Sequence, residues 1–184
     1  MKEHHECFLQ IIRSQGFDVD RVIVDGAGAL GNLEGKLSAP VRVVGPRTHV
    51  PEAEAYIGVI KQRLRCLEAA LPYGLTKRLI PHAVYFVSAC LNIVLKPGQT
   101  ISSREAFLGI KCDAKLDLRA EFGEYCQVHV SPDNNAKNTS ALRTVGALAV
   151  GPFHNNRGTY HFYGLRSCKF FKGDRWSNLP MPDL

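Results

Sequence analysis

The sequence has 184 residues, of which 45% are hydrophobic and 22% are charged, a balance typical of a folded globular chain. This composition excludes a long disordered or fibrous protein and leaves room for one domain or two small ones. Lysine and arginine outnumber aspartate and glutamate by 23 to 17, and the net charge of +6 favours a polyanionic partner such as nucleic acid.

Cysteine spacing and hydropathy further limit the kinds of protein that the sequence can encode. None of the six cysteines stands in a Cys-x-x-Cys pair, so the spacing does not indicate a zinc ribbon. The apolar stretch 79–95 is interrupted by Pro81 and by three polar residues, which predicts a buried core helix and no membrane partner. No signal-peptide pattern follows Met1. We therefore expect free thiols in a nuclear or cytoplasmic setting.

The first part of the chain alternates helical and strand patterns. Apolar residues within 5–14 suit a short amphipathic helix, which Gly16 is expected to end. The β-branched run 21–24 predicts a buried strand, and the run 41–44 predicts a second strand. Between them, residues 29–37 carry a helical pattern that two glycines weaken.

Three helical segments are expected next. The apolar spacing after Pro51 predicts a long helix that ends before Pro72. A further helix is expected over roughly 76–92. Residues 102–105 open a short helical turn that should end at Gly109.

The second half consists of short runs with strand-like content separated by turn residues. These runs are 124–130, 144–150, 159–163 and 167–172. Short strands at this spacing predict a small β-barrel or a meander. We place the domain boundary near residues 112–120, which gives a first domain over 1–112 and a second over 113–184.

Basic and aromatic residues are interleaved in this second half. The basic residues are Arg157, Arg166, Lys169, Lys172 and Arg175, and the aromatic residues are Tyr160, Phe162, Tyr163 and Phe170. Such interleaving suits a nucleic-acid surface. It equally suits a small barrel whose aromatic rings fill the core, and we favour this second interpretation.

Acidic residues stand at two points where they could meet. Asp25 directly follows the first strand and could reach a hard cation such as Mg²⁺, although an Asp-Gly turn is a common alternative. Glu52 and Glu54 stand in the first turn of the long helix, where an acid also complements the helix dipole. A strand-end Asp and a helix-borne Glu would supply two of the carboxylates that two-metal phosphoryl transfer needs.

Several stretches in a fixed order resemble the integrase region of Copia-type (Ty1-like) retrotransposon polyproteins. They are Val24–Ala29, Gly45–Glu54, Ser103–Gly109 and Arg119–Tyr125, followed by the glycine-rich and aromatic residues between Gly146 and Trp176. Those integrases belong to the ribonuclease-H-like DDE superfamily. The resemblance implies an α/β fold: an incomplete ribonuclease-H-like core over 1–112 and a small barrel-like β-domain over 113–184.

The resemblance also implies roles for individual residues. Asp25 matches the second catalytic Asp, and Glu54, not Glu52, matches the catalytic Glu. Both would bind Mg²⁺ or Mn²⁺. Lys61, Arg63 and Arg65 on the long helix would contact DNA phosphates. The sequence leaves open whether the chain forms a homo-oligomer.

Departures from the family's pattern predict metal binding that is weak or lost. No residue before Asp25 matches the first catalytic Asp, and Ala27 and Ala55 stand where the family has an acid and an arginine. The sequence therefore predicts a fragment of an enzyme of DNA integration, which acts by metal-dependent cleavage and strand transfer, with its activity lost. One alternative is a non-enzymatic nucleic-acid-binding or protein-interaction module of transposon origin. Another is an unstable fragment with exposed sheet edges.

Overall fold

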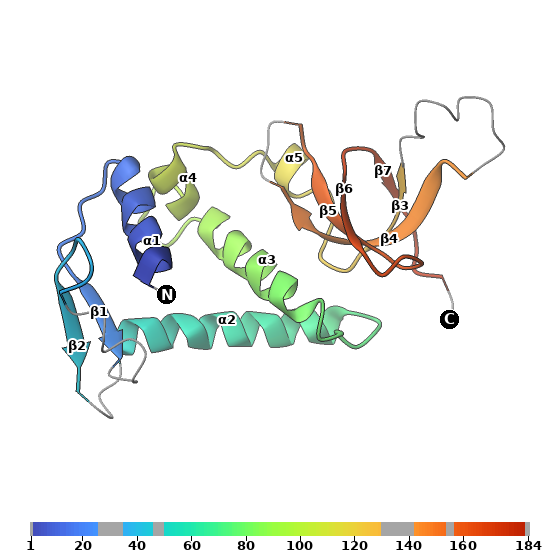
Figure 1. Cartoon of the computed structure of the whole chain (residues 1–184). Coiled ribbons are helices and arrows are strands. Elements are labelled where there is room, and N and C mark those ends of the chain that lie inside the picture. The colour runs from blue at the N-terminus through green and yellow to red at the C-terminus, as the bar shows by residue number, and fades with distance from the viewer. Residues whose placement is uncertain (1, 26–34, 46–49, 130–141, 154–156, 183–184) are drawn as a thin grey trace. The chain divides into compact units, whose positions relative to one another are not determined.

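The computed structural model describes residues 2–25, 35–45, 50–129, 142–153 and 157–182 (Figure 1). Helices make up 37% and strands 22% of the residues that the structure describes, so the expected mixed α/β class is confirmed. The chain divides into two compact units, Met1–Lys61 and Gln62–Leu184. The domain boundary between residues 112 and 113 rests on the resemblance to the integrase region, and it stays a prediction.

The first unit contains one helix, a pair of short strands and the beginning of a second helix. These are α1 (Lys2–Ser14), β1 (Val22–Asp25), β2 (Val41–Val44) and the start of α2 (Pro51–Ala70). β1 and β2 are parallel, and Asp25 pairs with Val44 at their carboxyl ends.

Among the described residues of this unit, three segments each carry a buried apolar side chain. Leu9 of α1, Val24 of β1 and Ala39 before β2 are these side chains. The carboxylate of Glu6 accepts a hydrogen bond from the backbone N–H of Ser38 at 3.1 Å, which ties α1 to the segment before β2. The same α1 ends as predicted, because Gly16 adopts a left-handed conformation with φ of 83°.

The helix predicted over 29–37 is not supported where the structure describes it. Residues 35–37 form a turn and a bend, and Gly35 has a positive φ of 69° that a continuing helix would not adopt. The remaining residues of that prediction, 29–34, lie outside the described residues.

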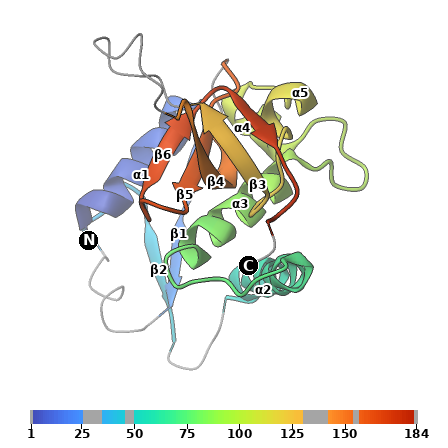
Figure 2. The ribbon, with the colours of Figure 1, turned by 90° about the vertical axis from the view of Figure 1, so that its right-hand side faces the viewer.

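The second unit combines helices with one antiparallel sheet. After the end of α2 it contains α3 (Ile80–Ile93), α4 (Ser103–Leu108), α5 (Ala114–Asp117), β3 (Tyr125–His129), β4 (Thr144–Pro152), β5 (Tyr160–Gly164), β6 (Phe170–Gly173) and β7 (Trp176–Asn178). The strand order is β6-β5-β4-β3-β7 (Figure 2). Strands β3 to β6 form the predicted meander, while β7, which the sequence did not predict, pairs with β3. The sheet is open.

Each face of the sheet carries its own core, because side chains alternate along a strand. One face holds a cluster of buried residues that includes Cys126, Val128, Tyr160 and Phe162. The other face contributes Leu148 and Val150, which pack with Leu79 and Ala83 of the α3 segment. α3 therefore covers part of this second face.

Local signals set the ends of the short helices. The Ser102 hydroxyl accepts a hydrogen bond from the N–H of Glu105 at 3.1 Å, and α4 ends at Gly109, with φ of 66°, as predicted. α3 begins at Ile80 and not at Thr76, because residues 77–79 form a turn. In the part of the chain that the structure describes, no helix is long and apolar enough to cross a membrane.

A buried polar network ties α4 and α5 to the sheet. The guanidinium of Arg104 donates to the carboxylate of Asp117 at 2.9 Å, and both side chains are buried. The hydroxyl of Tyr160 donates to the carbonyl of Asp117 at 2.7 Å and accepts from the N–H of Arg119 at 2.9 Å. Since each buried group has a partner, the network fixes α5 against β5 without leaving a polar atom unsatisfied.

Candidate functional site

The carboxyl end of the parallel strand pair is the position that the sequence singled out. Asp25 is the last residue of β1, and its backbone pairs with Val44, the last residue of β2. The chain then passes through Gly45 and enters α2 at Pro51. The backbone therefore leads from the end of the sheet directly into the helix that bears Glu54.

A cavity of about 330 Å³ lies along this strand pair. Its lining includes Ile23, Arg42, Val44 and Glu52. Among the described residues, the acid that lines the cavity is thus Glu52, whereas the resemblance assigns the catalytic role to Glu54. Helix spacing could have indicated this difference, because residues two positions apart point to different sides of a helix.

Glu54 lies in the first turn of α2 and is exposed to solvent. Its backbone N–H donates to the carbonyl of Val50 at 3.1 Å, which closes the first turn of the helix. Lys61 and Arg65 follow at intervals of seven and four residues and are also exposed. These intervals put the three side chains on one face, over a length of about 16 Å at 1.5 Å per residue.

Arg63 belongs to a different side of α2. At about 100° per residue it is roughly 160° away from Arg65 around the helix axis. Between the two, Leu64 and Leu67 are half-buried and pack against the cluster that contains Leu79. The three basic residues that the sequence grouped together therefore flank a packed apolar stripe, with two on one side and one on the other.

The carboxylates near the strand end are the residues that could hold Mg²⁺. Carboxylate oxygens are the ligands that this hard cation prefers. Among the described residues, however, no group of three or more His, Cys, Asp or Glu side chains could hold a metal ion. Glu52 and Glu54 do not form a metal site by themselves, and the metal-binding role of Asp25 stays a prediction.

The aromatic residues of the sheet divide between its two faces. Tyr160 and Phe162 are fully buried in one core, as the favoured interpretation predicted. Phe170 is 38% exposed on the opposite face, where Lys172 is also exposed. The prediction that the aromatic rings fill a core is therefore confirmed for the first two and wrong for Phe170. The alternation of side chains along β5 and β6 could have indicated which rings lie on which face of the sheet.

Comparison with known proteins gives no family. No protein-family model matches the chain, and no curated protein matches it.

Proposed function

We propose that this chain is part of a Copia-type retrotransposon integrase and that it binds duplex DNA through α2. In this proposal the first domain is an incomplete ribonuclease-H-like core, supported by the parallel pair β1–β2 that leads into α2. The second domain is barrel-like. This is supported by the link between the two edge strands of the sheet, β6 and β7. Only Asp174 and Arg175 separate them in the chain, so the two edges are connected by a short segment, as in a barrel.

The observation that carries the proposal is the exposed basic face of α2. Lys61 and Arg65 are exposed one helical turn apart, on the same face as Glu54. Lysine and arginine contacts to phosphate position a protein on DNA without reading its sequence. Because Leu64 and Leu67 anchor the helix by another side, the basic side chains can meet phosphates without losing core contacts.

In this proposal the chain binds duplex DNA but does not carry out strand transfer. The resemblance supplies only two of the three catalytic acids, Asp25 and Glu54, so we propose that integration activity is lost. We assign no catalytic step to a metal ion, because the described carboxylates do not complete a site for it.

Duplex binding measured over a series of salt concentrations tests the role of α2. Each phosphate contact that is lost should reduce the slope of log K against log salt by about 0.9. We expect Lys61→Gln/Arg65→Gln to reduce the slope by about 1.8. The charge-matched control is Lys36→Gln/Lys96→Gln, which removes two exposed cations away from α2. Equal losses in both variants, or no duplex binding by the unsubstituted chain, would contradict the proposal.

Nicking and strand transfer on labelled duplex DNA with Mg²⁺ or Mn²⁺ test the loss of activity. We expect no product from the unsubstituted chain or from Glu54→Gln. Metal-dependent product that disappears in Glu54→Gln would show that the acidic site is complete, and the inactivity proposal would then be wrong.

A further inference from the structure

A groove runs beside α3 on the sheet face that this helix only partly covers. One hollow of about 300 Å³ is lined by residues that include His82, Tyr85, Phe153 and His161. A second hollow of about 580 Å³, between α3 and α4, is also lined by Tyr85 and Phe153. Because the same two rings border both hollows, they form one groove in the second unit.

The two rings of this groove are exposed, and neighbouring groups hold the ring of Phe153 in place. Tyr85 is 66% exposed and Phe153 is 42% exposed. The ring of Phe153 lies 5.1 Å from that of His161, and the backbone N–H of Phe153 donates to the carbonyl of Thr159 at 2.8 Å. Large rings that are exposed to solvent side by side favour a binding surface over a core.

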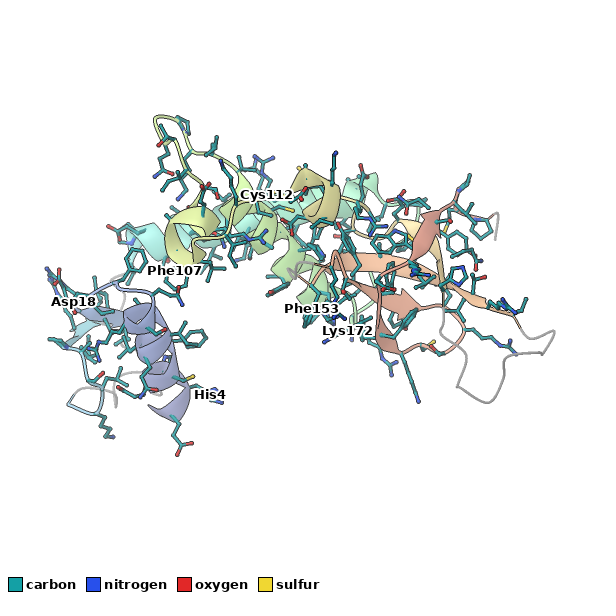
Figure 3. All side chains as sticks on the ribbon, turned by 90° about the horizontal axis from the view of Figure 1, so that it is seen from above. His4, Asp18, Phe107, Cys112, Phe153 and Lys172 are labelled. Atoms are coloured by element: carbon teal, nitrogen blue, oxygen red, sulfur yellow. The ribbon has the colours of Figure 1, made fainter. Side chains whose placement is uncertain are left out.

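Positive charge lies against these rings. The ammonium nitrogen of Lys172 is 3.7 Å from the centroid of the Phe153 ring, and the two side chains lie side by side in Figure 3. Lys172 also pairs across the strands with His161. Among the described residues that line either hollow, none is an aspartate or a glutamate.

We propose that this groove binds unpaired nucleotides, with bases stacked on Tyr85 and Phe153 and a phosphate held by Lys172. Aromatic rings combined with cations are the features that bind single-stranded nucleic acid, because every base has a face that can stack. A duplex does not offer these faces, since its bases are stacked on each other. The inference deepens the proposed function by adding a single-strand site on the second unit, apart from the basic face of α2.

Fluorescence anisotropy of the full chain with labelled oligothymidylate tests this site. We expect Tyr85→Ala and Phe153→Ala each to weaken binding by at least about fivefold, the effect of losing one base-stacking ring. Phe8→Ala is the matched control, because Phe8 is 64% exposed on α1, and it should leave binding unchanged. Lys172→Gln should reduce the salt slope for a single strand by about 0.7. Equal effects of Tyr85→Ala and Phe8→Ala, or no binding of the single strand, would overturn the proposal.

Duplex binding in parallel separates this inference from the proposed function. Tyr85→Ala should bind duplex DNA as the unsubstituted chain does. Lys61→Gln/Arg65→Gln should bind the duplex with the reduced salt slope given above. If duplex binding depends on α2 but the single strand does not bind, the groove inference fails and the proposed function stands. If the single strand binds in a Tyr85-dependent way but the duplex does not, the role of α2 fails and the groove stands. Circular dichroism of each variant confirms that a loss of binding is not a loss of folding.

Discussion

Removing the Tyr160 hydroxyl tests the polar network that fixes α5 to the sheet. In Tyr160→Phe the ring can keep its contacts with Trp176, whose ring centroid is 4.9 Å away. The hydrogen bond to the carbonyl of Asp117, at 2.7 Å, is lost. The bonds from the N–H groups of Arg119, at 2.9 Å, and of Ala120, at 3.4 Å, are lost as well. The substitution therefore removes polar contacts and almost no apolar area.

The burial of the three partners sets the size of the effect. Asp117 is 6% exposed and Ala120 is 7% exposed, so water does not readily replace the lost bonds, and the loss of a hydrogen-bond partner by a buried group costs about 1–3 kcal/mol. Arg119 is exposed, so its N–H can regain a bond to water. We therefore expect the free energy of unfolding to fall by about 2 kcal/mol. That loss corresponds to a Tm lower by about 4–8 °C for a chain of this size.

Urea unfolding followed by tryptophan fluorescence measures this loss. The sequence has one tryptophan, Trp176, and it reports on the core that contains Tyr160. Tyr85→Phe is the control, because its ring is 66% exposed and the change should stay within about 0.5 kcal/mol. A Tyr160→Phe midpoint equal to that of the unsubstituted chain, with an unchanged m-value, would refute the reasoning.

Three further outcomes follow from packing and burial. Gly123→Ala should lower stability by about 1–3 kcal/mol in urea unfolding, because φ is +83° and the new Cβ would lie 2.5 Å from the Tyr73 hydroxyl oxygen. Gly98→Ala, with φ of +78° and open space, should lose less. Burial raises the pKa of the Cys126 thiol to about 12, so it should react with a thiol reagent only after unfolding, whereas exposed Cys168 reacts at once. Burial raises the pKa of Tyr73 from 10.0 to about 12, so its stabilising contribution is complete below pH 10 and is lost as the pH rises to about 12. Tyr73→Phe should flatten that part of a stability–pH curve.

Local chemistry determined much of the secondary structure from the sequence. The run 41–44 is β-branched and forms β2 at the predicted residues. Pro51 begins α2, because a first-turn proline loses no helical hydrogen bond. Ser102 and Gly109 bound α4, because one caps free N–H groups and the other adopts a left-handed conformation. Each of these signals acts within a few residues, so no distant partner was needed.

Tertiary pairing decided what local signals could not. The three-residue β7 has no strand pattern of its own, and its pairing with β3 defines it. Cys168 has φ of 52° within the predicted strand 167–172, so the chain reverses there and β6 begins only at Phe170.

The residues of the candidate sites also divide into those that local signals indicated and those that only the tertiary structure brought together. The sequence placed Asp25 at a strand end and Glu54 in a first helical turn, because both positions depend on local structure. It did not indicate that Tyr85 and Phe153 border one groove, since 68 positions separate them and only the packing of α3 on the sheet brings them together. Periodicity determines the side of an element on which a residue lies, and the fold alone determines what that side meets.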